Sequence, residues 1–163
     1  MHYSASTLPE LSRPLIGAKL GALSRTAECA CGRVQVTVEG EPIAVATCHC
    51  EFCQRRTGSA FQVSAVFPQD QDVAVSGQTK VYNGLAVEGV GTAQGDDVTY
   101  HFCPTCGSTV FWTFQGRPIV AIAVGNFADP RFPAPTMELH TPFRHHWIRP
   151  VEGAEQFESY RPR

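Results

Sequence analysis

Seven cysteines in three short clusters restrict most strongly what this chain can fold into. The clusters read C-x-C, C-x-C-x-x-C and C-x-x-C. Their members are Cys29 and Cys31, then Cys48, Cys50 and Cys53, then Cys103 and Cys106. Disulfides would strand one of seven thiols, whereas these spacings account for all seven as metal ligands. Thiolate-rich sites favour zinc, so the sequence predicts two Zn2+ ions per chain. An iron–sulfur cluster is the alternative, although its ligands more often come in denser runs.

Length and composition indicate a single domain without a charged partner. The chain has 163 residues, of which 43% are hydrophobic, enough for a core of ordinary size. Its formal net charge is -2 and 17% of its residues are charged, so it lacks the dense basic surface that holds nucleic acid or anionic lipid. No stretch approaches the roughly 20 apolar residues of a membrane span, and the N-terminus does not resemble a signal peptide. We therefore expect a cytoplasmic protein with no nucleic-acid or membrane partner, in a compartment that keeps thiols reduced.

Short alternating runs predict a mainly β fold. Val34, Val36 and Val38 alternate with polar residues, which is the pattern of a half-buried strand. Similar runs occupy residues 43–47, 61–67, 73–75, 79–82, 98–102, 109–114 and 119–124. Turn residues separate these runs, as expected for packed antiparallel sheets. The one persuasive helix covers residues 51–57 and ends at Gly58.

The two ends of the chain have a different character from its middle. Residues 1–27 show no sustained period, so we interpret them as an N-terminal arm with one short helix at most. Residues 28–150 form the zinc-binding domain and residues 151–163 a C-terminal tail. Beyond Asp129 the chain is rich in proline, which cannot continue regular structure for long, and we expect a wrapping segment with one strand near residues 136–140.

How the seven cysteines divide decides what the metal can do, because four ligands saturate a zinc ion and three leave a position free. In an extended backbone, residues two apart point to the same face, so each C-x-C can present both sulfurs to one metal. One division gives a closed site to the first and last clusters and an open site to the middle one. The rival pairs the two C-x-x-C units as a zinc ribbon, whose pairs usually lie roughly 15 to 20 residues apart, far closer than here. Spacing weakens the rival and leaves both open.

The residues that follow the middle cluster are candidates for binding substrate. Arg55, Arg56, Thr57, Gly58 and Ser59 come directly after the ligand turn, and cationic and hydroxyl groups there could receive a substrate carboxylate. A solvated basic surface is the alternative, and the sequence does not choose between them. The neighbouring His49 points away from its two flanking ligands in extended backbone, so we interpret it as a packing residue.

The segments around the cysteines resemble a known family. C-x-C-G before an alternating strand, CHCEFCQRRTGSAF, HFCPTCGSTVFW and VGNFADP occur in this order from Cys29 to Asp129. Together they resemble the glutathione-dependent formaldehyde-activating enzyme family, which shares its domain with centromere protein V. The resemblance implies a zinc-binding, mainly β fold similar to Mss4. It also implies carbon–sulfur lyase chemistry, in which glutathione and formaldehyde combine reversibly to S-hydroxymethylglutathione.

The same resemblance implies the roles of the cysteines. By it, the structural zinc is held by Cys29, Cys31, Cys103 and Cys106 and the catalytic zinc by Cys48, Cys50 and Cys53. This chain has Glu138 where family members commonly place a histidine, in a P-T-x-H-I-W type of segment. The thiol substrate is therefore either glutathione or a different thiol.

Two functions follow from these observations. The first is a zinc-dependent carbon–sulfur lyase that adds a thiol to formaldehyde or a related small aldehyde, with a labile catalytic zinc. The second, suggested by the centromere-protein relatives, is a non-catalytic module that uses zinc to hold a platform for a protein partner. Exchange of one zinc on adding thiol would favour the first, and two inert zinc ions the second.

Overall fold

The computed structural model describes residues 23–70, 72–84 and 98–160. These residues form eleven strands, one α-helix and two 3-10 helices. The strands are β1 (Ser24–Glu28), β2 (Gln35–Glu39), β3 (Ala44–Cys48), β4 (Gln62–Pro68), β5 (Val73–Ser76), β6 (Lys80–Gly84), β7 (Val98–Phe102), β8 (Thr109–Phe114), β9 (Arg117–Ala123), β10 (Met137–Leu139) and β11 (Glu155–Gln156). The helices are α1 (Glu51–Thr57), η1 (Val124–Phe127) and η2 (Thr141–Phe143). Within the described ranges, no helix has both the length and the hydropathy to cross a membrane.

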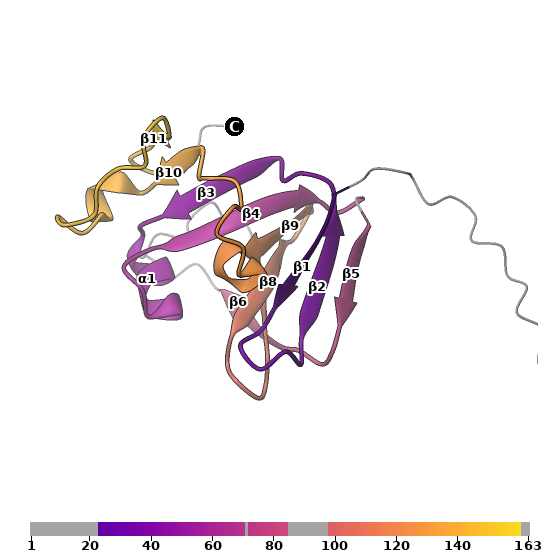
Figure 1. Cartoon of the computed structure of the whole chain (residues 1–163). Coiled ribbons are helices and arrows are strands. Elements are labelled where there is room, and N and C mark those ends of the chain that lie inside the picture. The colour runs from indigo at the N-terminus through magenta and orange to yellow at the C-terminus, as the bar shows by residue number, and fades with distance from the viewer. Residues whose placement is uncertain (1–22, 71, 85–97, 161–163) are drawn as a thin grey trace, which may run out of the picture.

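The strands form two sheets that pack against each other. The smaller sheet has the order β1-β2-β5, and the larger has the order β11-β10-β3-β4-β9-β8-β7-β6. Neighbouring strands are antiparallel except for β10, which runs parallel to both β3 and β11. The small sheet lies on one side of the large sheet and α1 on the other (Figure 1). The prediction of a mainly β, mostly antiparallel fold is confirmed.

The main core fills the space between the two sheets. Val36 and Val38 of β2 are fully buried, while the alternate residues Gln35, Thr37 and Glu39 are partly exposed. They pack against the facing side of the large sheet, where Phe67, Val110 and Ile122 are also fully buried. The alternating pattern in the sequence therefore reports which side of each strand faces the opposite sheet.

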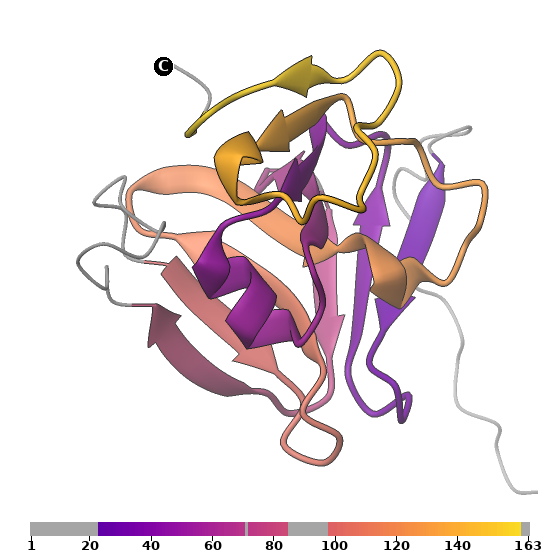
Figure 2. The same ribbon diagram turned by 90° about the vertical axis from the view of Figure 1, so that its left-hand side faces the viewer.

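The opposite face of the large sheet carries α1. Phe52 and Cys53 of the helix pack against Tyr100, Trp112 and Ala121 of the sheet. The helix begins after Cys50, which is its N-cap, and ends at Gly58, whose φ of 67° lies in the left-handed region that glycine adopts without strain. The helix predicted over residues 51–57 is confirmed. Figure 2 shows α1 in front of the large sheet, with β10 and β11 above it.

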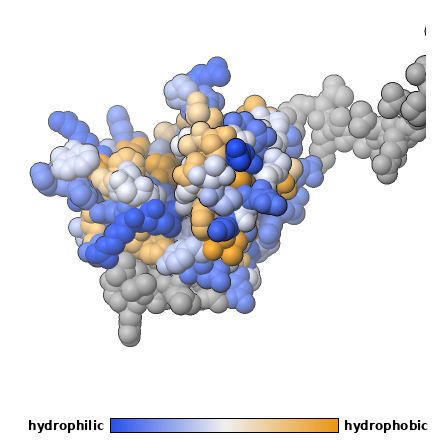
Figure 3. Space-filling view, turned by 90° about the horizontal axis from the view of Figure 1, so that it is seen from below, coloured by the Kyte–Doolittle hydropathy of each residue, from blue (hydrophilic) through white to orange (hydrophobic). Residues whose placement is uncertain are grey.

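Two strands lie in segments that the sequence analysis assigned to the arm and the tail. β1 begins at Ser24, pairs with β2 along its whole length and buries Ala27. Residues 24–27 of the predicted arm, which covered residues 1–27, are therefore part of the small sheet. The correction has a simple cause, because a five-residue strand with one small buried side chain gives little periodicity. The remainder of that arm, through residue 22, lies outside the described residues. β11 adds a short edge strand from the C-terminal tail. Viewed from below, the visible described surface mixes hydrophobic and hydrophilic residues (Figure 3).

Candidate metal centres

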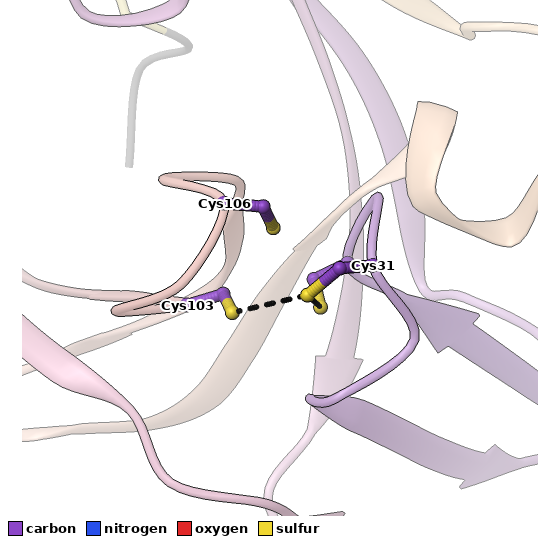
Figure 4. A group of neighbouring side chains, drawn as sticks. Cys31, Cys103 and Cys106 are labelled. Carbon is purple, nitrogen blue, oxygen red and sulfur yellow. Dashed lines mark hydrogen bonds between the residues drawn. The ribbon is translucent and has the colours of Figure 1, made fainter.

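The first and last cysteine clusters meet in space. The sulfurs of Cys29, Cys31, Cys103 and Cys106 all lie within 4.8 Å of one another, although 72 residues separate Cys31 from Cys103. Cys31 Sγ is 3.7 Å from Cys103 Sγ and 3.5 Å from Cys29 Sγ. Figure 4 shows the loop that carries Cys103 and Cys106 facing the loop that carries Cys31. The structure thus brings together one group of four thiols.

Tight turns place these four sulfurs. Each cluster is followed directly by a glycine in the left-handed region, Gly32 with φ of 71° and Gly107 with φ of 75°. The backbone N–H of Gly32 donates to the carbonyl of Cys29 at 2.8 Å, and that of Gly107 donates to the carbonyl of Cys103 at 2.9 Å. The hydroxyl of Ser108 accepts from the backbone N–H of Ala30 at 3.2 Å and joins the two turns. The sequence C-x-C-G and C-x-x-C-G is thereby explained as two turns that present sulfurs to one point.

The middle cluster forms a separate group of three thiols. The sulfurs of Cys48, Cys50 and Cys53 lie within 4.8 Å of one another, and Cys48 Sγ is 3.5 Å from Cys50 Sγ. Cys48 ends β3, while Cys53 lies in α1 and its backbone N–H donates to Cys50 Sγ at 3.4 Å. Cys50 is 2% exposed and Cys53 9%, whereas Cys48 is half-buried. Within the described part of the chain no fourth cysteine, histidine or carboxylate joins this group.

The crowding of three thiols has an electrostatic consequence. Hydrogen bonds from Cys48 and from Cys53 lower the pKa of the Cys50 thiol to about 2. The same contacts act in reverse on their donors: Cys50 raises the pKa of Cys48 to about 12, and Cys48 and Cys50 raise the pKa of Cys53. Without a cation the group therefore gives up one proton readily and retains the other two. A cation at the centre would allow all three to ionise, so the donor set suits a metal ion.

Both groups fit zinc. Around a tetrahedral zinc, Zn–S distances of about 2.3 Å place the sulfurs about 3.8 Å apart. The S–S distances of 3.5 Å and 3.7 Å come close to this value, and the remaining pairs within each group lie within 4.8 Å. All seven cysteines are free thiols, as a thiolate site requires. The grouping matches the division that the family resemblance implies, with four donors in one group and three in the other.

The substrate-binding candidates separate into two residues that line a cavity and three that do not. Arg56 and Thr57 line a polar cavity of about 260 Å3, whose lining also includes Gln62, the neighbour of Cys48 across the sheet, and Gly107 and Ser108, which follow Cys106. The guanidinium of Arg56 stacks on Tyr100, 4.4 Å from the ring centroid, and its Nε and Nη2 atoms are buried with no hydrogen-bond acceptor among the described residues. By contrast, Arg55 is exposed and pairs with Glu51 at 3.0 Å. The two remaining candidates are exposed and follow the helix: Gly58 is its C-cap, and Ser59 comes next.

A buried network of charged and polar groups lies next to the three-cysteine group and includes His49, the residue between Cys48 and Cys50. His49 is fully buried, and its Nε2 lies 2.9 Å from Oε1 of Glu138, which is 1% exposed. The other oxygen of Glu138 accepts from Arg144 at 3.1 Å, from the backbone N–H of Val151 at 2.9 Å and from Gln156 at 2.7 Å. Burial alone raises the pKa of Glu138, but hydrogen bonds, first from Gln156 and then from His49, outweigh it and hold the pKa below its ordinary value. An ionised carboxylate thus ties the C-terminal segment to the strand end that carries the ligands.

Sequence reasoning missed two polar residues beside this group. Gln62 pairs with Cys48 across β3 and β4, and its Oε1 is buried without a donor in the described part of the chain. His140 is 6% exposed, has φ of 56° and carries a buried Nε2 that also lacks a described partner. Burial lowers the pKa of His140, while the neighbouring Cys50 thiolate raises it in part. No local pattern marks either residue as a neighbour of the cysteines, and only the three-dimensional arrangement brings them there.

Comparison with known proteins shows which family this chain belongs to. No curated protein matches the chain. A crystal structure of a Rhodobacter sphaeroides protein is similar at 18% identity, with 81% of this chain and 98% of that chain covered and a TM-score of 0.46. The sequence profile of the glutathione-dependent formaldehyde-activating enzyme matches residues 24–142, which include all seven cysteines. The chain therefore belongs to the glutathione-dependent formaldehyde-activating enzyme family.

Proposed function

We propose that this protein is a zinc-dependent carbon–sulfur lyase that reversibly adds a thiol to formaldehyde or a related small aldehyde. The observation that carries the proposal is the inequality of the two cysteine groups, four thiols in one and three in the other. A four-thiolate site has no position for substrate, whereas a three-thiolate site keeps one. Family membership supports chemistry on formaldehyde with glutathione.

The two groups take different roles in this proposal. Structural zinc would be held by Cys29, Cys31, Cys103 and Cys106, and catalytic zinc by Cys48, Cys50 and Cys53. Zinc in the second group would supply a cation that favours the ionised form of the substrate thiol, whose ionisation at pH 7 otherwise costs roughly 2 kcal/mol. We also propose that residues 28–150 form the domain that carries this chemistry, in a compartment that keeps thiols reduced.

The reaction conserves atoms and electrons without any redox partner. The S–H bond of the thiol breaks and a C–S bond forms at the carbonyl carbon. The π electrons of the C=O bond move to the oxygen, which takes up the proton that the sulfur lost. The reverse reaction breaks the C–S bond and restores the aldehyde and the thiol.

Residues of the polar cavity would hold the thiol substrate. Arg56 has a buried guanidinium edge for which the described residues offer no acceptor, and Gln62 lines the same cavity. A substrate carboxylate would complete the hydrogen bonding of Arg56, with Thr57 at the rim. Stacking on Tyr100 fixes the guanidinium plane, so the carboxylate would bind in one orientation. We assign Arg55, Gly58 and Ser59 a supporting role at the helix end, because they do not line the cavity.

Most of the rate acceleration must come from positioning. The gain from favouring the ionised thiol is only about thirty-fold, given an ordinary thiol pKa of about 8.5. Holding two reactants in contact supplies far more, up to about 7–11 kcal/mol of the barrier. Tyr100 and Trp112, which pack against Cys50 and Cys53, are buried residues of the large sheet and are suited to that task.

Turnover by zinc-loaded protein tests this proposal. Formation of the hydroxymethyl thiol from formaldehyde should exceed the spontaneous rate with at least one thiol of a panel that includes glutathione. Cys50→Ala should abolish the excess and release one zinc while the fold is retained. A rate equal to the spontaneous one for every thiol, from protein that holds two zinc ions, would contradict the proposal. Two zinc ions that are both inert to thiol would instead support a binding module.

A further inference from the structure

We infer that the aldehyde substrate carries an alkyl or aryl substituent, which occupies an apolar pocket of about 460 Å3 beside the three-cysteine group. This inference rests on the proposed function and names its substrate class. Formaldehyde has no substituent on its carbonyl carbon, so such a pocket would contribute nothing to its binding.

The strand register places the pocket next to the thiols. Cys48 and Ala46 lie on the same face of β3, because side chains two residues apart share a face, and they are separated by about 7 Å along the strand. Across the sheet, Cys48 pairs with Gln62 and Ala46 pairs with Ser64. Gln62 lines the polar cavity, whereas Ala46 and Ser64 line the apolar pocket. Cys48 therefore lies between the two hollows: its partner Gln62 lines the polar cavity, and the next pair on the same face, Ala46 and Ser64, lines the apolar pocket.

β10 flanks β3 on its other side and brings the pocket up to Cys48. Leu139 pairs with Cys48 and Met137 pairs with Ala46, and both β10 residues line the pocket. Trp112 belongs both to the pocket lining and to the cluster of side chains packed around Cys50. The pocket and the candidate catalytic centre thus share a wall.

The hollow arises from small residues surrounded by large ones. Ala46, Ser64 and Ala121 lie on three strands of the large sheet, and none fills the space above it. Larger side chains complete the lining, among them Trp112, Phe114, Met137, Leu139 and Tyr160. A volume of several hundred Å3 is the size of pockets that bind small organic molecules.

The lining favours an uncharged guest. Among the described residues of the lining the one charged member is Arg117, whose guanidinium lies 5.6 Å from the ring centroid of Phe114. Glutathione carries two carboxylates and an ammonium group, and a mostly apolar lining with one cation does not replace the water that these three charged groups would lose. The polar cavity, with the unaccepted edge of Arg56, is the better site for a charged thiol. The apolar pocket is then left for the substituent of the aldehyde.

The size of the effect follows from burial of methylene groups. Each buried CH2 is worth about 0.8 kcal/mol, which corresponds to roughly a four-fold change in an equilibrium or rate constant. From ethanal to hexanal, kcat/KM should therefore rise by roughly four-fold for each carbon added, until the pocket is full.

A chain-length series on zinc-loaded protein tests the inference. Straight-chain aldehydes from formaldehyde to octanal are compared at a fixed concentration of glutathione. Ser64→Leu, which fills the hollow, should remove the rise with chain length. The matched control, Ser76→Leu, places the same change on the exposed edge strand of the small sheet and should keep the rise. A flat wild-type series, or an unchanged rise in Ser64→Leu, would overturn the inference.

Binding of unreactive analogues provides a readout apart from turnover. The chain has two tryptophans, and Trp147 is 62% exposed, so Trp147→Phe leaves the fluorescence of Trp112 to report on the pocket. Primary alcohols from ethanol to octanol should bind with affinities that rise roughly four-fold per carbon, and Ser64→Leu should abolish this dependence. Affinities independent of chain length would overturn the assignment whatever the turnover.

The outcomes separate the two proposals. If no aldehyde, formaldehyde included, reacts faster than the spontaneous rate, the proposed function fails and the substrate assignment fails with it. If formaldehyde is turned over as well as hexanal, only the substrate assignment fails. A rise with the length of alkyl thiols, together with a flat aldehyde series, would also overturn the assignment, because the pocket would then serve the thiol.

Discussion

Glu138→Gln should destabilise the protein strongly, although the change is nearly isosteric. The carboxylate of Glu138 accepts hydrogen bonds or contacts from His49, Arg144, Val151 and Gln156 while only 1% exposed. The amide removes the negative charge and presents an NH2 group to donors that need an acceptor. Breaking a buried ion pair on one side costs about 3–5 kcal/mol, and we expect about 3 kcal/mol because the amide oxygen still accepts.

Urea unfolding of zinc-loaded protein measures this loss. With m of about 2 kcal/mol/M, a loss of 3 kcal/mol lowers the midpoint by about 1.5 M. Glu152→Gln removes the same charge from an exposed site and should shift the midpoint by less than about 0.3 M. Equal shifts in the two variants would refute the reasoning, because burial and pairing of Glu138 would then carry no energetic weight.

The difference between wild type and Glu138→Gln should also depend on pH. The pKa of Glu138 is lowered in the folded protein from its ordinary value of 4.5. A lowered carboxyl pKa stabilises the fold fully above the unfolded pKa, and this stabilisation is lost as pH falls through the folded pKa. The difference in unfolding free energy should therefore be constant near pH 7 and shrink below pH of about 4.5. A difference that grows on acidification would contradict an ionised Glu138.

Three further predictions concern substrate, backbone and metal. Arg56→Met should lower kcat/KM roughly 10- to 100-fold for a carboxylated thiol and little for an uncharged one, whereas Arg55→Met should have a small effect on both. Equal losses for the two thiols in Arg56→Met would show that Arg56 does not bind the substrate carboxylate. Gly77→Ala should lower the unfolding free energy by about 3 kcal/mol or more, because at φ of 86° the added Cβ would lie 1.9 Å from the carbonyl oxygen of Arg33. In Gly153→Ala the added Cβ would meet no atom within 4 Å, and the loss should be about 1–2 kcal/mol. Similar thermal midpoints for the two variants would contradict the steric argument. A chelator should remove one zinc well before the other, and simultaneous loss of both, followed with a zinc-sensitive dye, would contradict unequal centres.

Local patterns in the sequence predicted much of the fold. The helix over residues 51–57 was recognisable from its polar sequence and its terminating Gly58, and most strands from their alternation. β1 was missed because its pattern, with Ala27 as the one buried residue, gives no hydrophobic period. β11 is only two residues long and depends on pairing with β10.

The site required knowledge of long-range pairing. Spacing alone left two divisions of the cysteines open, since the partners Cys31 and Cys103 lie 72 residues apart. The role of Glu138 was equally hidden, because its partner His49 is 89 residues away and no local pattern pairs the two residues. The small side chains Ala46, Ser64 and Ala121, which leave the hollow in the sheet, come together only through the pairing of β3 with β4 and of β4 with β9.

X-ray absorption at the zinc edge tests the central claim most directly. Two zinc ions per chain, one with four sulfur ligands and one with three, give a mean sulfur coordination of about 3.5, and a bound thiol should raise this mean to about 4. In Cys50→Ala, one zinc ion with four sulfur ligands should remain. A mean of four before any thiol is added, or a single zinc in the wild-type protein, would contradict the claim that Cys48, Cys50 and Cys53 hold an unsaturated metal.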